Sequence, residues 1–559
     1  MKSAPTEQKL RGGYYTPKPI ADFLAAWAIR SGDDLVLEPS CGDGELAGAA
    51  VRRFQAFRKT STHLGAITAI EIEKSEAQAA RRRLADIDGQ RIATVVRGDF
   101  FEHSRKWGLG APLFAKYTPF DAVIGNPPFI RYQNFPEDCR NIAIDLMGRV
   151  GFTPNRLTNA WVPFLIVAAH LLKEDGRLAM VLPSELLQVS YAAETRQFLS
   201  HFFERVTIVT FRDLVFGSIQ QDIVLLLGER RTRHEKGIAV VELNDVSELK
   251  GLAVDAAAHP VALDHSSEKW LQYFLDQKEI DLLRLVNSHH DVARLGVLAD
   301  VDVGLVTGEN SFFVLTGEAT EQLKLWRSTA KLVSRSAHVQ GLRFASSDWE
   351  DCLNRQQRVL LFCPPDADKA RLSAADARYI KSGEDQGLNK GYKCRIRKRW
   401  WVVPSQWVPD AFGLRQVHAY PRIVLNHAGA HATDTLHRIR FKPGVSPARV
   451  ASAFVNSLTL AASEVTGRGY GGGVLTFEPS EFEALPIPLV KEAGPNVEDL
   501  DRRIRTKDVY ACLEVTDKVL LQDGLGLGRR DVLRLRRSWE KLRNRRIARK
   551  ATSSLPRAV

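Results

Sequence analysis

The stretch FDAVIGNPPFI, residues 120–130, places an apolar run directly before a glycine, an asparagine, two prolines and a phenylalanine. The run 120–124 predicts a buried strand, which the prolines end, because neither offers a backbone N–H to a sheet and each fixes its own φ. The turn that follows presents a side chain with both a donor and an acceptor, Asn126, and a flat ring, Phe129. This combination suits the binding of a planar group that carries an amino substituent.

Further short apolar runs on both sides of this stretch alternate with amphipathic segments from about residue 19 to residue 227. Strands that alternate with helices, and that are apolar almost throughout, are typical of a largely parallel sheet covered on both faces. We therefore expect an α/β fold, a doubly wound domain. The other predicted strands are residues 34–37, 66–70, 94–96, 178–182, 206–209 and 223–227.

The rhythm of strands and helices stops at the polar stretch GERRTRHEKG, residues 228–237. Beyond it, irregular strand and loop signals with interleaved Trp, Arg, Lys and Gly indicate a second architecture, and after about residue 495 the chain becomes helical and basic. The length also favours more than one domain. We expect a first domain over residues 1–245, a connecting segment over 246–295, a second domain over 296–490 and a basic helical C-terminal region over 491–559.

The composition narrows the class of protein. The 559 residues carry a formal net charge of +12, which is consistent with a polyanionic partner and equally with a solvated surface. The six cysteines show neither a disulfide framework nor the spacing of a zinc site, so we expect no metal and a reducing, cytoplasmic location. Because no apolar run approaches about 18 residues, we expect no membrane segment.

The first predicted strand leads into LEPSCGDGELAGAA, residues 37–50. An acid at the strand end, Glu38, followed by a turn with Gly42 and a helix, is the arrangement that brings a nucleoside-bearing cofactor against backbone amides. It is not the dinucleotide fingerprint, and a glycine turn of this kind is often purely structural. Taken alone it is weak evidence.

Two more acids follow the ends of the next strands. Glu71 ends the second strand, where its carboxylate can accept the hydroxyls of a ribose. Asp99, in RGDFFEH, ends the third strand, where it can accept the amino group of an adenine with Phe100 or Phe101 against the ring. Each acid has an alternative role as a solvated charge or a helix cap. The ordered series at successive strand ends favours a binding edge.

This series resembles the gamma-type, TaqI-like S-adenosylmethionine-dependent N6-adenine DNA methyltransferases of restriction-modification systems. The stretch GGYYTPKPIADFLAAWAI, residues 12–29, resembles their segment for the methionine end of the cofactor, and FRDLVFGSIQQDIVLLL, residues 211–227, resembles the segment whose aromatic ring stacks on the target base. The resemblance implies a Rossmann-like class I methyltransferase domain, a mixed α+β DNA target-recognition domain and a basic helical tail. The implied cofactor residues are Tyr15, Thr16, Glu38, Pro39, Ser40, Gly42, Glu71, Ile72, Asp99, Phe100 and Asn126.

The resemblance also implies a reaction. A methyl group passes from S-adenosylmethionine to the N6 amino group of an adenine flipped out of double-stranded DNA, and this protects the DNA from a cognate restriction endonuclease. The implied catalytic residues are Asn126, Pro127, Pro128 and Phe129. The implied stacking residues for the target base are Phe129 and Phe216.

A basic and aromatic stretch in the second half, NKGYKCRIRKRWWVVPSQW, residues 389–407, suits a DNA-facing strand. A basic edge strand with core tryptophans is an equal alternative. The stretches YPRIVLNHAG, residues 420–429, and GRGYGGGVLTFEPSEFEALPIP, residues 467–488, resemble specificity domains of the same family. The basic tail suits backbone phosphates, or equally a solvated helix. The candidate DNA-binding residues are Lys393, Arg395, Arg397, Lys398 and Arg399.

Other readings of the same motifs stay open. Methyltransferases that act on RNA guanine or on protein glutamine also use Asn-Pro-Pro-aromatic, although they are generally shorter and carry their extra domain before the glycine loop. The modification subunit of a multi-subunit restriction complex usually has a long N-terminal helical domain, which we do not expect here. A DNA-binding protein that has lost its activity would bind cofactor without methyl transfer, and the intact Glu71, Asp99 and Asn126 argue against it.

Overall fold

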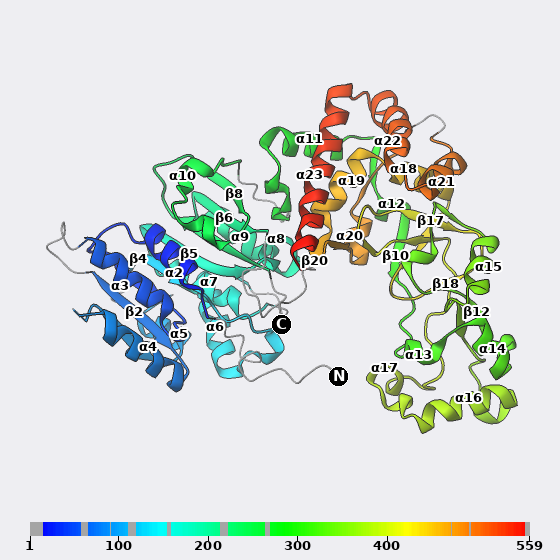
Figure 1. The fold of residues 1–559 in the computed structure, drawn as a ribbon, viewed down its shortest axis with the longest axis horizontal. Coiled ribbons are helices and arrows are strands. Elements are labelled where there is room, and N and C mark those ends of the chain that lie inside the picture. Colours follow the sequence, from blue (N-terminus) through cyan, green and yellow to red (C-terminus); the bar gives the residue numbers. More distant parts are fainter. Residues whose placement is uncertain are drawn as a thin grey trace. The chain divides into compact units, whose positions relative to one another are not determined.

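The computed structural model describes residues 15–57, 65–89, 91–109, 119–153, 158–212, 222–262, 269–470, 472–490 and 494–553. The chain divides between residues 277 and 278 into two compact units (Figure 1). Of the described C-terminal residues, 548–553 group with the first unit. This boundary lies inside the predicted connecting segment 246–295. None of the described helices is long and apolar enough to cross a membrane.

The first unit is built on an eight-stranded sheet in the order β3-β2-β1-β4-β5-β7-β6-β8. β7 runs antiparallel to both of its neighbours, and the other strands are parallel to one another. All seven predicted strands are present, and β8, which follows GERRTRHEKG, is an additional one. The bounds are β1 Leu35–Glu38, β2 Ala66–Glu71, β3 Ala93–Arg97, β4 Phe120–Gly125, β5 Leu172–Pro183, β6 Arg205–Phe211, β7 Ile223–Glu229 and β8 Gly237–Leu243.

Both faces of the sheet are buried in its central strands β4, β5, β6 and β7, whereas the edge strand β3 is only partly buried. Successive residues of a strand point to opposite faces, so Ala122 and Ile124 of β4 pack in the core cluster formed with α2, α3 and α4, whereas the fully buried Val123 points to the other face. This accounts for the nearly continuous apolar runs. The helices are α2 Lys18–Ala28, α3 Glu45–Phe57, α4 Lys74–Ile87, α5 Phe100–Lys106, α6 Glu137–Arg149, α7 Trp161–His170, α8 Glu185–Gln188, α9 Ala193–Phe202 and α10 Val254–Ala257, with short 3₁₀ turns at Tyr132–Asn134, Ser190–Ala192, Val246–Leu249 and Trp270–Phe274.

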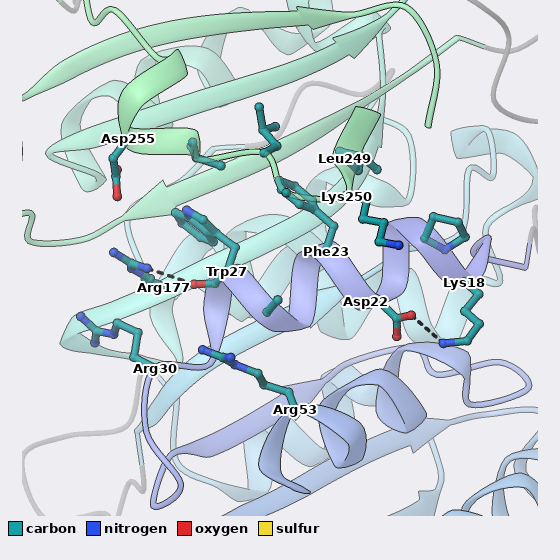
Figure 2. A pocket seen from close by; sticks show the side chains of 15 residues that line it. Lys18, Asp22, Phe23, Trp27, Arg30, Arg53, Arg177, Leu249, Lys250 and Asp255 are labelled. Carbon is teal, nitrogen blue, oxygen red and sulfur yellow. Dashed lines mark hydrogen bonds and ion pairs between the residues drawn. The ribbon is translucent and has the colours of Figure 1, made fainter. Parts of the chain in front are cut away.

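Helix α2 is held at its C-terminal end by arginines that line a pocket of about 830 Å³ (Figure 2). Arg177 donates to the Trp27 carbonyl at 3.0 Å, and Arg53 donates to the Ile29 carbonyl at 3.0 Å. The last carbonyls of a helix have no partner within the helix, and cationic donors are favourable there. The arginines of this pocket therefore hold the C-terminal end of α2 in place. The N-terminal end of α2, Lys18, directly follows Tyr15-Thr16-Pro17.

The second unit contains several small sheets, as expected for a mixed α+β region. Five strands have the order β10-β19-β15-β17-β13, four have the order β11-β14-β12-β18, three have the order β16-β21-β20, and β22 pairs with β9. The bounds are β9 Val292–Arg294, β10 Ala299–Val303, β11 Val314–Leu315, β12 Thr329–Val333, β13 Arg343–Phe344, β14 Leu360–Phe362, β15 Ala411–Gly413, β16 Gln416–Val417, β17 Ile423–Asn426, β18 His431–Ala432, β19 His437–Phe441, β20 Arg468–Tyr470, β21 Val474–Thr476 and β22 Pro486–Pro488.

Helices surround these sheets and make up the end of the chain. The described residues of the predicted C-terminal region are mostly helical from α21 onward, and they include a π-helix at Asp517–Gly524. The bounds are α11 Gln277–Asn287, α12 Leu295–Leu298, α13 Asn310–Phe313, α14 Gly317–Leu323, α15 Ser346–Asn354, α16 Ala374–Asp385, α17 Tyr392–Arg395, α18 Pro447–Phe454, α19 Ser457–Thr466, α20 Pro479–Glu483, α21 Val497–Arg505, α22 Val509–Thr516 and α23 Arg529–Ser553.

Candidate active site

The carboxyl ends of β1, β2 and β4 bring three of the predicted residues to one edge of the sheet. Glu38 is the last residue of β1, Glu71 the last of β2, and Asn126 directly follows β4. Because these strands are parallel neighbours, their ends lie side by side. Open α/β sheets bind their ligands at this edge.

Two hydrogen bonds connect the glycine loop after β1 to the end of β2. The backbone N–H of Gly42 donates to Glu71 Oε2 at 2.8 Å, and the N–H of Cys41 donates to the Ile70 carbonyl at 2.8 Å. Gly42 has φ of +50°, and a Cβ there would meet no atom within 4 Å, so the loop is open on that side. Gly44, with φ of +83°, is needed for packing, because a Cβ there would lie 2.9 Å from that of Ala80.

The carboxyl groups of Glu38, Glu71 and Asp43 lie close to one another at this loop. Burial raises the pKa of Glu71, although its Oε1 and Oε2 accept the backbone N–H groups of Glu73 and Gly42. Burial also raises the pKa of Glu38 well above its usual range, and repulsion from Glu71 and Asp43 adds to this. Glu38 Oε2 is buried without a hydrogen-bond partner in the protein. The site therefore favours a ligand that brings hydrogen-bond donors and positive charge.

The residues at the rim of this edge are Tyr15 and Ile72. The Tyr15 hydroxyl donates to Glu76 Oε1 at 3.1 Å, and burial together with this carboxylate raises the pKa of Tyr15. Ile72 directly follows Glu71 and is 52% exposed, so it offers an apolar surface beside the acid. The Tyr15 hydroxyl, the Glu76 carboxylate and the Ile72 side chain thus lie around the carboxyl end of β2.

Asp99 and Phe100 occupy the start of α5. Asp99 Oδ1 accepts the N–H groups of Phe101 at 2.6 Å and Glu102 at 3.0 Å, which is the helix-cap role considered as its alternative. Phe100 is 3% exposed, and its ring stacks on that of Phe164 with centroids 5.3 Å apart. Phe100 is thus a core residue here, and contact of this pair with an adenine stays a prediction.

The segment Asn126-Pro127-Pro128-Phe129 is connected to the glycine loop and to the start of α2. Asn126 Nδ2 donates to Thr16 Oγ1 at 3.1 Å, and the Ser40 hydroxyl is 3.4 Å from the Asn126 carbonyl oxygen. Pro39 lies against Gly125, where an added Cβ would be 3.3 Å from Pro39 Cδ. The structure thus brings Thr16, the glycine loop and Asn126 together.

The predicted ring pair for a target base is described only in part. Phe129 is partly buried against the core cluster formed with α2, α3 and α4. Phe216 falls within 213–221, outside the described residues. Stacking of a base between these two rings stays a prediction.

Three polar side chains at the neighbouring strand end were not singled out from the sequence. Glu185 follows β5, and it lies within hydrogen-bonding distance of Tyr191 and Asn159. An acid after an apolar run is the same signal that identified Glu38 and Glu71. Asn159 and Tyr191 carry no comparable local signal.

The basic stretch of the second unit forms the short helix α17 and turns, whereas we expected a strand there. Lys393, Arg395 and Lys398 are exposed. Arg397 Nη2 instead donates to the carbonyls of Val306 at 2.9 Å and Thr307 at 2.8 Å.

Arg399 is also engaged within the protein. It pairs with Asp366 at 2.5 Å and with Asp368 at 2.7 Å, and these two carboxylates raise its pKa. Trp400 and Trp401 are buried, as in the alternative considered above. The candidate DNA contacts of this stretch therefore reduce to Lys393, Arg395 and Lys398.

Two arginines of the basic tail are structural. Arg546 is buried and donates to both oxygens of Glu464, at 2.8 and 2.6 Å, and to the Gly473 carbonyl at 2.6 Å. Arg536 pairs at 2.8 Å with the buried Asp517. Helix α23 is therefore, up to residue 547, part of the packed second unit.

The strand order with a reversed β7, together with a glycine loop and strand-end acids at the carboxyl edge, defines an S-adenosylmethionine-dependent, Rossmann-like methyltransferase fold. Residues 57–218 match the family model described as Eco57I restriction-modification methylase, and residues 267–521 match the C-terminal domain of Type II methyltransferase M.Eco57I. These two matches support a methyltransferase of the restriction-modification type.

Individual relatives agree with this assignment. The chain is 22% identical over 497 residues to Type II methyltransferase M.AccI of Acinetobacter calcoaceticus, covering 84% of each chain. It is 28% identical over 466 residues to Type II methyltransferase M.BanIII of Aneurinibacillus aneurinilyticus, covering 74% of this chain and 76% of the relative. Among solved structures, the Type IIL restriction-modification enzyme MmeI in complex with DNA gives a TM-score of 0.57 at 12% identity, over 94% of this chain and 75% of that one, which shows a shared fold.

Proposed function

We propose that this protein is a sequence-specific DNA methyltransferase that methylates the N6 amino group of an adenine flipped out of double-stranded DNA. The observation that carries the proposal is the position of Asn126 at the carboxyl end of β4, with its amide nitrogen on Thr16 and its backbone beside the glycine loop. The adenine assignment and the gamma-type, TaqI-like subtype rest on the order of the motifs along the chain.

The residues at the sheet edge fit S-adenosylmethionine. When bound, this cofactor supplies a methyl group activated by a positively charged sulfonium. The buried carboxyl groups of Glu38 and Glu71 favour a cationic ligand, and the open side of Gly42 admits one close to the backbone. Tyr15, Thr16, Pro39, Ser40 and Ile72 surround the same space in this proposal. Asp99 and Phe100 complete it on the adenine side.

The role of the Asn-Pro-Pro-Phe segment follows from the weak nucleophilicity of an amino group on a heteroaromatic ring. Its lone pair is delocalised into the ring, so it must be freed before the nitrogen can react. The Asn126 Oδ1 and the Pro127 carbonyl accept the two amino hydrogens, which favours a tetrahedral nitrogen with an available lone pair. Pro128 keeps the turn rigid, and Phe129 supports the ring by stacking. The nitrogen would gain the methyl group as the bond between that carbon and the sulfonium sulfur breaks. The sulfur would leave as a neutral thioether, and one amino proton would pass to water.

A base within a duplex is out of reach of such a pocket, so the target nucleotide must be extruded. Phe129 and Phe216 hold the extruded base in this proposal. The second unit supplies the surface for the duplex, and Lys393, Arg395 and Lys398 are its candidate phosphate contacts. Tyr392 and Ile396, exposed by 64% and 61%, lie in the same stretch and add aromatic and apolar contacts. In the cell, methylation would protect DNA from a cognate restriction endonuclease, a functional partner.

The test is transfer of a labelled methyl group to unmethylated genomic DNA, followed by digestion and identification of the labelled nucleoside. We expect N6-methyladenine with the unaltered protein and none with Asn126→Ala. The matched control is Asn354→Ala, which removes an exposed amide at the end of α15 in the other unit. Label on cytosine would overturn the base assignment, and label only on RNA or protein would overturn the DNA substrate.

A further inference from the structure

The end of β5 lies beside the Asn-Pro-Pro-Phe segment on the side away from the glycine loop. β4 stands between β1 and β5, and Gly125 of β4 is in register with Met180 of β5. β5 continues to Pro183, and Glu185 then begins α8. Because the two strands are parallel, the residues after Pro183 lie at the same edge of the sheet as the residues after Gly125.

Three half-buried side chains form one hydrogen-bonded cluster here, which we call the β5-edge cluster: Glu185, Tyr191 and Asn159. The Tyr191 hydroxyl donates to Glu185 Oε2, and Asn159 Nδ2 donates to the Tyr191 oxygen at 2.8 Å. Asn159 Nδ2 also lies 3.4 Å from Glu185 Oε2. Burial and the Glu185 carboxylate raise the pKa of Tyr191, so its hydroxyl keeps its proton at neutral pH and remains a donor.

This cluster is connected to the Asn-Pro-Pro-Phe segment through the backbone. The N–H of Ala160, the residue after Asn159, donates to the Ile130 carbonyl at 2.9 Å, and Ile130 directly follows Phe129. Pro127 and Pro128 have no N–H with which to anchor the segment from within. The segment is thus tied near Asn126 by Ser40 and Thr16, and at its far end by Ala160.

We propose that the β5-edge cluster positions the far end of the Asn-Pro-Pro-Phe segment, so that Phe129 holds the target base at the angle required for methyl transfer. The inference rests on the proposed function and adds three positioning residues to it. The side chains act through the Ala160 N–H and the Ile130 carbonyl. Misplacement of reacting groups by about 1 Å lowers a rate by about 100-fold, so a loosened segment would slow transfer.

The test compares Tyr191→Phe with Tyr379→Phe. Tyr379 is a matched control in the other unit, because its hydroxyl, like that of Tyr191, is half-buried and donates a hydrogen bond, here to the Phe312 carbonyl at 2.8 Å. We expect Tyr191→Phe to lower the single-turnover rate of DNA methylation at least tenfold, with the cofactor Kd within twofold of the unaltered protein. The Tm should change no more than in the control.

Two variants of Glu185 distinguish a positioning role of the cluster from a general loss of structure. Glu185→Gln keeps an oxygen that accepts from Tyr191, so its rate should stay within a few-fold of the unaltered protein, whereas Glu185→Ala should fall as far as Tyr191→Phe. A second readout is independent of activity: the Ala160 amide should exchange its hydrogen faster in Tyr191→Phe than in the unaltered protein.

The outcomes are distinguishable. An unaltered protein that methylates no DNA would overturn the proposed function, and the Ala160 exchange rates would still decide whether the cluster holds the segment. Normal methylation by Tyr191→Phe, or unchanged Ala160 exchange, would overturn this inference alone. A rate loss matched by weaker cofactor binding and a lower Tm would also overturn it, because that pattern indicates a purely structural role.

Discussion

The side-chain amide of Asn126 donates a hydrogen bond to the hydroxyl oxygen of Thr16 at 3.1 Å. An amide has a donor end and an acceptor end, so a nitrogen directed to Thr16 turns Oδ1 the other way. The acceptor proposed to bind the target amino group is thereby oriented by a residue 110 positions earlier in the chain. Thr16 in turn precedes α2, whose C-terminal carbonyls accept from Arg53 and Arg177.

Thr16→Val should lower the rate of methyl transfer about fivefold, because a valine methyl group cannot accept from Asn126 and one neutral hydrogen bond contributes about 1 kcal/mol. Thr16→Ser retains the hydroxyl and should stay close to the unaltered protein. Single-turnover kinetics at saturating cofactor provide the measurement. Equal rates for the two variants would show that the hydroxyl does not orient Asn126.

Glu38→Gln should stabilise the cofactor-free protein more at pH 8 than at pH 5. The pKa of Glu38 is higher in the folded than in the unfolded state, since burial and nearby acids disfavour its charge. Its contribution to stability is therefore greatest below about pH 4.3 and is lost as the pH rises through the folded-state pKa. Thermal melting of both proteins across this range would test the sign, and a Tm difference independent of pH would contradict it.

Arg546→Met should destabilise the second unit by about 3–5 kcal/mol, because it leaves Glu464 buried without its partner. Arg537→Met, on an exposed position of the same helix, is the matched control and should change stability by less than about 0.5 kcal/mol. Urea unfolding gives both values. The double variant Arg546→Met/Glu464→Met should recover part of the loss, and a single variant no less stable than the control would refute the role of the pair.

Replacing Lys393, Arg395 and Lys398 together by glutamine should weaken DNA binding and flatten its salt dependence. Each phosphate contact contributes about 0.9 to the slope of log K against log salt, so loss of three lowers the slope by about 2.7. Fluorescence anisotropy at several salt concentrations measures this, with Arg530→Gln as a control at an exposed position of α23. Arg399→Gln should leave the slope unchanged, because Arg399 already pairs with Asp366 and Asp368.

The sheet of the first unit was largely predictable, because buried parallel strands leave continuous apolar runs. β8 was missed, since the polar turn before it interrupts the alternation of strands and helices. The antiparallel direction of β7 could not be predicted either, because an apolar run does not encode the direction of a strand. For the stretch around α17, abundant basic residues favoured an exposed strand, and the sequence carried no signal that Arg397 donates to carbonyls about 90 residues away.

The sequence by itself determined where the strands end and which side chains follow them: Glu38, Glu71 and Asn126. These features depend on local chemistry, namely apolar periodicity, glycine turns and the missing N–H groups of Pro127 and Pro128. Only the tertiary structure decided which polar groups are partners. Thr16 with Asn126, Tyr191 with Glu185, and Arg546 with Glu464 are pairings set by how elements pack. A charged or polar side chain has the same sequence signature whether it faces water, a ligand or a buried partner.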